Sequence, residues 1–124
     1  MSLRVLLVED SNADAAIAER ALRVNDGAFE VTITGSLDAG IDRLGEGFDA
    51  ILLDLTLPDS AGPETVKRMR AAARRVPIVV LTSAEGDEIA GRCLLAGADA
   101  YRRKGQLGPH ELGDVLSRAI EKGH

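Results

Sequence analysis

The chain has 124 residues, of which 45% are hydrophobic and 28% charged, and its formal net charge is −5. This length suits one domain over residues 1–124, and the composition is that of a globular protein, not a disordered one. Basic residues form only short groups, so we expect no direct binding of nucleic acid. No stretch approaches the roughly 20 apolar residues of a membrane span, and the single cysteine, Cys93, fits a cytoplasmic location without disulfides.

The first half of the chain alternates apolar runs with helical patterns. Leu3–Val8 and Phe29–Thr34 are predicted strands, and a helix is predicted from Asn12 to Val24. The apolar residues at helical spacing in that helix are Ala13, Ala16, Ile17, Ala21 and Val24. Ser36 can cap a second helix, which contains Leu37, Ile41 and Leu44 and ends at Gly45 and Gly47.

The second half repeats the pattern three times. Ala50–Leu53, Ile78–Thr82 and Ala100–Arg103 are predicted strands. Pro63 suits the first turn of a helix that runs to about Ala73. A fourth helix is predicted over Gly86–Ala96, and a fifth begins near Pro109. The apolar face of the fifth helix consists of Leu112, Val115, Leu116, Ala119 and Ile120.

Five strands that alternate with five helices predict an α/β fold with a parallel sheet covered by helices on both faces. Five strands are too few for a closed eight-stranded barrel, which favours an open doubly wound sheet. The functional crevice of such a sheet lies beyond the carboxyl ends of the strands.

Charged and hydroxyl side chains follow several of the predicted strands. Glu9 and Asp10 come after the first strand, Asp54 after the third, Thr82 ends the fourth, and Lys104 follows the fifth. Because all five strand ends face one edge, these side chains converge. Carboxylates 4 Å apart repel by about 4 kcal/mol per pair at an effective dielectric of 20, and Mg²⁺ is the cation expected to relieve this repulsion.

The pattern also predicts an anion at this edge, held by the positive charge of Lys104. A carboxylate can act as a nucleophile and form an acyl phosphate, and Asp54 is the candidate acceptor. Mg²⁺ and Lys104 would neutralise the phosphoryl oxygens, and the Thr82 hydroxyl could donate a hydrogen bond to one of them. No GxGxxG motif follows the first strand, which argues against a dinucleotide site on the same kind of sheet.

Taken together, these residues resemble the receiver domain of two-component response regulators. The resemblance covers essentially the whole chain and is carried by Glu9-Asp10, Asp54 with Pro58 and Gly62 behind it, Thr82, Gly97-Ala98, Tyr101 and Lys104. It implies a flavodoxin-like fold with strand order 2-1-3-4-5. Two departures from many relatives are Ala61-Gly62, where Asp-Gly is common, and Gly105, where a proline is common.

The resemblance implies that Asp54 accepts a phosphoryl group from a sensor histidine kinase or a phosphotransfer protein. Glu9, Asp10, Asp54 and the backbone carbonyl of Thr56 would hold Mg²⁺. Thr82 and Tyr101 would form the switch pair. The domain would catalyse only its own phosphotransfer and autodephosphorylation, and is not otherwise expected to be an enzyme.

Two alternatives remain open from the sequence. A degenerate receiver could act as a constitutive protein-interaction module, although the intact acids and Lys104 argue against it. A metal-dependent phosphatase with an aspartyl intermediate typically has a second acid two residues after its nucleophile, where this chain has Thr56.

An output surface is expected on the face that contains Tyr101. On a helical projection of Gly86–Ala96, an arc that includes Ile89, Cys93 and Leu94 lies opposite Leu95, which should be exposed. Together with Tyr101, Arg102 and Arg103, Leu95 could bind a downstream protein or a tethered output domain, or support a phosphorylation-dependent homodimer.

Overall fold

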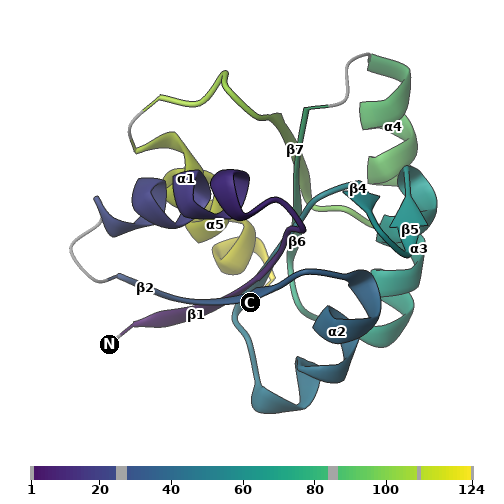
Figure 1. The fold of residues 1–124 in the computed structure, drawn as a ribbon, viewed down its shortest axis with the longest axis horizontal. Coiled ribbons are helices and arrows are strands. Elements are labelled where there is room, and N and C mark those ends of the chain that lie inside the picture. The colour runs from purple at the N-terminus through teal and green to yellow at the C-terminus, as the bar shows by residue number, and fades with distance from the viewer. Residues whose placement is uncertain (1, 25–27, 84–86, 109, 124) are drawn as a thin grey trace.

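The computed structural model describes residues 2–24, 28–83, 87–108 and 110–123. Its main feature is a parallel sheet of five strands in the order β2-β1-β3-β6-β7 (Figure 1). The strands are β1 (Leu3–Val8), β2 (Phe29–Thr34), β3 (Ala50–Leu53), β6 (Ile78–Thr82) and β7 (Ala100–Arg103). If only the five strands of this sheet are numbered along the chain, leaving out β4 and β5, the order is 2-1-3-4-5. The predicted fold class, strand bounds and strand order are therefore confirmed.

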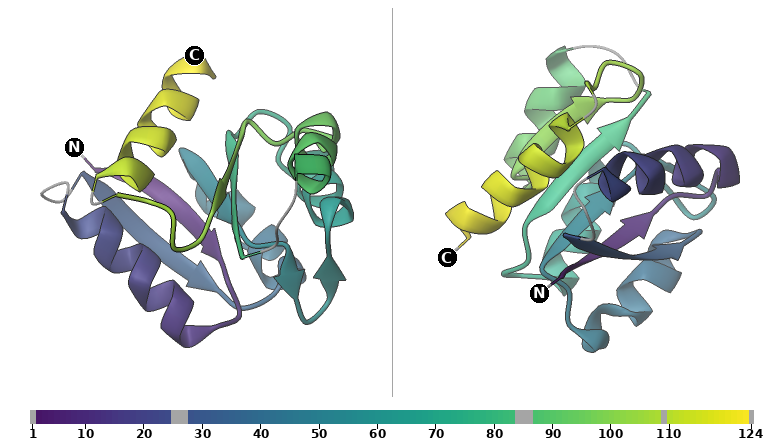
Figure 2. Two further views of the ribbon diagram at one scale, coloured as in Figure 1. Left: turned by 90° about the horizontal axis from the view of Figure 1, so that it is seen from above. Right: turned by 90° about the vertical axis from the view of Figure 1, so that its left-hand side faces the viewer.

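In the described parts of the chain, five α-helices cover the two faces of the sheet (Figure 1 and Figure 2). The core on one face includes residues of α1 (Asn12–Arg23) and α5 (Glu111–Lys122). The core on the other face includes residues of α2 (Leu37–Asp42), α3 (Pro63–Ala72) and α4 (Asp87–Ala96). The predicted helix starts at Gly86 and Pro109 lie outside the described residues. Within the described parts of the chain, no helix is long and apolar enough to cross a membrane.

The alternation of side chains along each strand separates these two cores. In β1, Leu6 and Val8 pack against the α2–α4 layer, while Val5 and Leu7 pack toward α1 and α5. Both sets are almost completely buried, as the near-continuous apolar sequence of the strand predicts. The sheet is therefore rigidly packed on both faces, and polar side chains gather where the strands end.

The buried face of α1 differs from the predicted one. Ala15, Ala18 and Leu22 face the core, whereas Ile17 is 63% exposed and Val24 is 43% exposed. The prediction was wrong because α1 contains alanines all around its circumference, so two overlapping apolar arcs compete. Ala15 and Ala18 are small enough to let the helix approach the sheet closely, and this contact selects their arc.

A short antiparallel hairpin, not anticipated from the sequence, follows β3. It consists of β4 (Thr56–Leu57) and β5 (Ser60–Ala61). Its turn residue Asp59 accepts hydrogen bonds from the backbone N–H groups of Leu37 and Asp38, both at 2.9 Å. These bonds satisfy donors at the start of α2 that have no partner within the helix, and they lower the pKa of Asp59.

The second predicted helix is capped as expected but is shorter than expected. The Ser36 hydroxyl accepts a hydrogen bond from the N–H of Ala39 at 3.1 Å. The helix α2 ends at Asp42, and Leu44 belongs to a separate 3₁₀ turn, η1 (Leu44–Glu46). Gly47, with a φ of 81°, ends this turn in the left-handed region that glycine favours.

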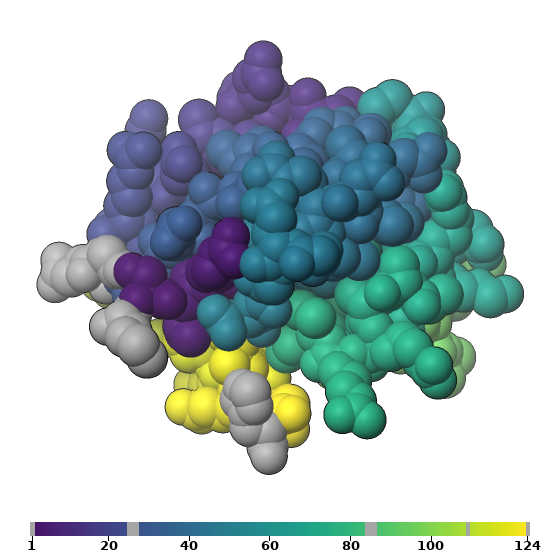
Figure 3. Space-filling view, turned by 90° about the horizontal axis from the view of Figure 1, so that it is seen from below, coloured from purple at the N-terminus to yellow at the C-terminus, as the bar shows by residue number. Residues whose placement is uncertain are grey.

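The first residues of β1 and the last turn of α5 both lie on the face of the molecule seen in Figure 3, where they are purple and yellow. Because the five strands are parallel, this is the edge at which the strands begin. The carboxyl ends of the strands lie at the opposite edge, where the polar side chains collect.

Candidate functional site

The strand register brings the predicted site residues to one edge of the sheet. Val8 pairs with Leu53, so Glu9 and Asp54 follow neighbouring strands at the same level. The N–H of Asp54 donates to the carbonyl of Val8 at 3.1 Å, and the N–H of Glu9 donates to the carbonyl of Thr34 at 2.9 Å. These bonds hold the backbone of Asp54 against β1 and that of Glu9 against β2, independently of any contact between their side chains.

Three carboxylates form the centre of the site. One oxygen from each of Glu9, Asp10 and Asp54 lies within 4.8 Å of the others. Glu9 and Asp54 are each only 5% exposed, whereas Asp10 is exposed. Such a group of hard oxygen donors, open to solvent on one side, fits Mg²⁺ with part of its water shell retained. The expectation that these three acids converge is confirmed by their positions.

Lys104 neutralises part of this negative charge. Its ammonium is very close to Glu9 Oε1, and it lies 2.9 Å from Asp14 Oδ2 and 3.4 Å from Asp54 Oδ2. Its backbone N–H donates to the carbonyl of Thr82 at 2.8 Å. Gly105 then adopts a φ of 82°, which proline cannot adopt, so this loop turns in a way that depends on glycine.

The environment shifts two pKa values in the site. Burial raises the pKa of Glu9 and the nearby charge of Asp54 adds to this, although hydrogen bonds from Lys104 and Ser11 oppose the rise. Burial works to lower the pKa of Lys104, but its hydrogen bonds to Glu9 and Asp14 and the neighbouring negative charges outweigh burial and raise it. Lys104 is therefore a permanent cation in this site.

The two oxygens of Asp54 have different partners. Oδ1 accepts a hydrogen bond from the N–H of Leu55 at 2.8 Å, while Oδ2 faces Lys104. This arrangement holds the carboxylate in one orientation. A carboxylate that attacks an anionic group needs a nearby cation to offset the repulsion, and Lys104 lies in that position beside Asp54.

The proposed switch residues occupy neighbouring strands. Thr82, at the end of β6, is completely buried, and Tyr101 in β7 is partly buried against the α2–α4 core. Tyr101 pairs with Val80, two residues before Thr82 on the adjoining strand. Thr56 begins β4 two residues after Asp54, and its side chain is exposed. Thr82 and Thr56 thus lie near the carboxyl ends of the strands, and Tyr101 lies in β7, the strand next to β6.

One residue of the site was not anticipated. Asp14, in the first turn of α1, contacts Lys104, which is 90 positions away in the sequence. In the sequence, Asp14 is only an acidic residue in the first turn of a helix. Such residues are common because they interact favourably with the helix dipole, so Asp14 did not stand out. Its approach to Lys104 depends on how α1 packs against the sheet.

The predicted output face agrees in part with the structure. Leu95 is 90% exposed, as expected from the helical projection, but Leu94 is also 49% exposed, so placing it on the buried arc was wrong. Cys93 is the one fully buried residue of the described part of α4. Because only Cys93 among the described residues of this helix is fully buried, most of α4 faces away from the core and both leucines are accessible. Arg102 and Arg103 are partly buried, and Arg102 donates to the carbonyl of Tyr101 at 2.8 Å.

Comparisons with known protein families, sequences and structures all lead to receiver domains of response regulators. Residues 5–116 match the response regulator receiver domain family. The cell cycle response regulator CtrA of Brucella ovis is 40% identical over 129 aligned residues, which cover 98% of this chain and 53% of CtrA. The chain therefore spans about half the length of the curated relatives that it matches.

Solved structures of receiver domains are similar over nearly the whole chain. A CheY-like receiver domain protein from Methanospirillum hungatei superposes with a TM-score of 0.85 at 25% identity, covering 99% of this chain and 97% of that one. The receiver domain of the sensor histidine kinase PA1611 from Pseudomonas aeruginosa has a TM-score of 0.82 at 31% identity, covering 98% and 99%. That structure has a magnesium ion coordinated in its active-site cleft.

Proposed function

The chain belongs to the response regulator receiver domain family of two-component signalling, and we propose that it is a phosphorylation-dependent switch with Asp54 as the phosphoryl acceptor. The observation that carries this proposal is the position of Asp54: buried, within 4.8 Å of two further carboxylates, and 3.4 Å from the ammonium of Lys104. The phosphoryl donor would be a phosphohistidine on a sensor histidine kinase or a phosphotransfer protein.

The transfer follows from the charge of the site. A carboxylate oxygen of Asp54 attacks phosphorus and forms a P–O bond, while the P–N bond to the donor histidine breaks and its electron pair returns to the imidazole. Lys104 stabilises the negative charge on the phosphoryl oxygens. Hydrolysis of the acyl phosphate within the same site would end the signal, and we propose no other enzymatic activity.

A cation site fits the carboxylates of this chain. Glu9, Asp10 and Asp54, with the backbone carbonyl of Thr56, would hold Mg²⁺, as the related PA1611 receiver holds magnesium in its cleft. Bound Mg²⁺ would supply positive charge to the phosphoryl oxygens and reduce repulsion among the carboxylates. The chain's own part is to present these oxygens at one strand edge and to bury two of the three acids.

Phosphorylation would be reported through Thr82 and Tyr101. The buried Thr82 hydroxyl is placed at the end of β6, from which it could donate a hydrogen bond to a phosphoryl oxygen. Its movement would leave space that the ring of Tyr101 can fill, because Tyr101 packs against the core that contains Val80, and Thr82, two residues further along β6, points to the same face of the sheet. Such a coupled movement would change the surface formed by α4, β7 and α5.

That surface is the proposed site of output. The sequence predicts that Leu95 lies on it together with Tyr101, Arg102 and Arg103. In the structure, the exposed Leu95 borders a hollow with residues of α3, whereas Arg102 borders another hollow with residues of α5. The reader would be a downstream protein, a second copy of the chain, or a tethered output domain, since the matched relatives are about twice as long as this chain. A degenerate receiver that binds partners without phosphorylation is the competing proposal.

One experiment separates these two proposals. The purified protein is incubated with acetyl phosphate and Mg²⁺, and its intact mass is measured with and without EDTA. We expect one phosphoryl addition in the wild type, none in Asp54→Asn, and a normal addition in Asp42→Asn, which changes an exposed aspartate of α2. A folded wild-type protein that gains no mass would support the degenerate module instead.

A further inference from the structure

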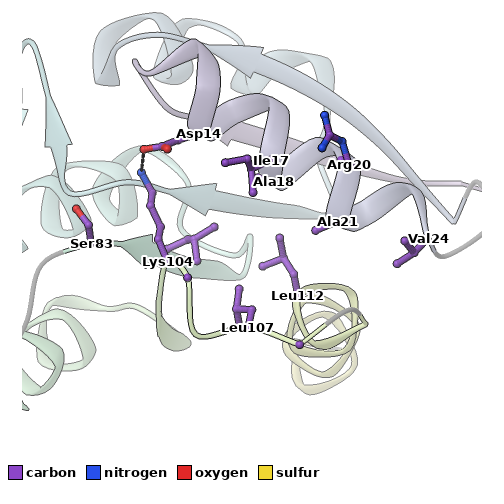
Figure 4. A pocket seen from close by; sticks show the side chains of 13 residues that line it. Asp14, Ile17, Ala18, Arg20, Ala21, Val24, Ser83, Lys104, Leu107 and Leu112 are labelled. Carbon is purple, nitrogen blue, oxygen red and sulfur yellow. Dashed lines mark hydrogen bonds and ion pairs between the residues drawn. The ribbon is translucent and has the colours of Figure 1, made fainter.

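Asp14 connects the lysine of the site to the helix α1. Its Oδ2 lies 2.9 Å from the ammonium of Lys104, closer than the 3.4 Å that separates this ammonium from Asp54. Figure 4 shows the Lys104 side chain extending from the chain after β7 to the carboxylate at the start of α1. Asp14 stands outside the group of three carboxylates that could share a cation. The ammonium thus lies between the acids of the site and a fourth acid.

The ordinary role of an acid at a helix start does not explain this contact. The Asp14 N–H donates to the Ser11 hydroxyl at 3.2 Å, which caps the helix, and a first-turn carboxylate interacts favourably with the helix dipole. Both interactions would be complete with the side chain in solvent. Instead, Asp14 is 42% exposed and contacts a lysine that is itself only 17% exposed.

The three contacts of Lys104 also differ in whether they involve a candidate cation ligand. The contacts with Glu9 and Asp54 involve two of the three candidate cation ligands, whereas the contact with Asp14 involves none of them. A lysine without Asp14 would have only Glu9 and Asp54 as partners in this set of contacts. It would then compete with a cation for both.

We propose that Asp14 is a positioning residue for Lys104, which draws the ammonium toward α1 and so reduces its competition with a cation for Glu9 and Asp54. The same ion pair with Asp14 also weakens the attraction between the Lys104 ammonium and an anion that approaches Asp54. This role rests on the proposed function of Asp54 as phosphoryl acceptor. It predicts that Asp14 tunes the site in opposite directions for cations and for anionic phosphodonors.

The expected effects follow from the strength of a partly exposed ion pair, which is at most about 1 kcal/mol, or about fivefold in an equilibrium constant. Asp14→Asn should weaken Mg²⁺ binding about two- to fivefold, because Lys104 then stays on Glu9 and Asp54. At saturating Mg²⁺, the same variant should need about two- to fivefold less acetyl phosphate for half-maximal phosphorylation, because the freed ammonium attracts the anion.

A double-mutant cycle tests whether these effects pass through Lys104. Mg²⁺ affinity is measured by calorimetry for the wild type, Asp14→Asn, Lys104→Met and the double variant. If Asp14 acts by positioning Lys104, the loss of Mg²⁺ affinity caused by Asp14→Asn should shrink at least by half in the Lys104→Met background. An equal effect in both backgrounds would mean that Asp14 acts only by its charge, and would overturn the proposal.

Two further variants complete the test. Glu19→Gln removes the same charge and an ion pair, with Arg23, from the same helix, and should leave both readouts unchanged. Asp14→Glu keeps the charge and should restore Mg²⁺ affinity to near the wild-type value. Failure of Glu to restore it, in a variant that unfolds at the normal temperature, would contradict positioning. A wild type that binds Mg²⁺ but takes no phosphate would refute the proposed function, while the calorimetric cycle would still decide the role of Asp14.

Discussion

The backbone N–H of Lys104 donates a hydrogen bond to the carbonyl oxygen of Thr82 at 2.8 Å, which ties the ends of two neighbouring strands together. The proposed counter-ion of the phosphoryl group and the proposed switch hydroxyl are thus held in one rigid unit. Their side chains nevertheless have different surroundings, because Lys104 contacts three carboxylates while Thr82 is completely buried. Substitutions of the two residues should therefore separate phosphoryl binding from its transmission.

Thr82→Ala should still accept phosphate from acetyl phosphate but transmit the change poorly, because the hydroxyl that would report the phosphoryl group is gone. Lys104→Ala should impair signalling strongly, because the phosphoryl charge loses its protein counter-ion. Intact mass measures uptake, and NMR shifts of Tyr101 with and without phosphodonor measure transmission. Normal phosphorylation-dependent shifts in Thr82→Ala would remove the switch role of Thr82.

Asp10→Ala should weaken Mg²⁺ binding by at least about tenfold, or ~1.4 kcal/mol, because one of the three converging carboxylates is lost. In buffer without divalent cations, the same variant should be more stable than the wild type by up to about 1 kcal/mol, since Asp10 is an exposed like charge beside Glu9 and Asp54. Thermal unfolding with and without Mg²⁺ measures both effects. Unchanged affinity would contradict the three-acid site.

Arg70→Lys should destabilise the fold by about 1–3 kcal/mol. The guanidinium donates to the carbonyl of Gly97 at 2.7 and 3.1 Å, to the carbonyl of Val76 at 2.8 Å, and to Asp99 at 2.8 Å. A lysine cannot reproduce this fork of donors, so the carbonyls of Val76, in the segment after α3, and of Gly97, directly after α4, would lose partners. Arg68→Lys, on the exposed side of the same helix, is the matched control and should change the unfolding free energy by less than about 0.5 kcal/mol.

Cys93 should make the protein less stable at alkaline pH. The side chain is fully buried, and burial raises the pKa of its thiol. The folded state therefore holds this proton more tightly than the unfolded chain, and stability is lost as pH rises above the ordinary thiol pKa of about 8.5. The difference in unfolding free energy between the wild type and Cys93→Ala should shrink from pH 7 to pH 10. A difference that does not depend on pH would be inconsistent with this reasoning.

Leu95→Asp should spare phosphorylation of Asp54 but weaken phosphorylation-dependent binding of a partner or a second copy. The side chain is 90% exposed, so the substitution should not disturb folding. Sedimentation of phosphorylated and unphosphorylated protein measures self-association, and a pull-down measures partner binding. Arg74→Asp provides a control on another exposed surface position. If neither assay changes for phosphorylated Leu95→Asp, the output surface lies elsewhere.

The sequence by itself determined the strands and their parallel direction, whereas their order came from the resemblance to receiver domains. Runs such as Ile78–Leu81 are apolar throughout, and such runs are typical of parallel strands that are covered on both faces. Once the strands are parallel, their carboxyl ends share an edge, so Glu9, Asp54 and Lys104 had to converge. This part of the site depends on the direction and order of the strands, which is why it could be predicted without knowing how the helices pack.

Only the tertiary structure decided which face each helix buries and which charges meet across elements. In α1, the sequence could not choose between the arc of Ile17 and the arc of Ala18, because both are apolar and helical spacing is the same for each. The contact between Asp14 and Lys104 depends on that choice, as does the exposure of Leu94 on the packing of α4. Local periodicity records the spacing of residues, whereas the rotation of a helix about its axis is set by the shape of the sheet surface against which it packs.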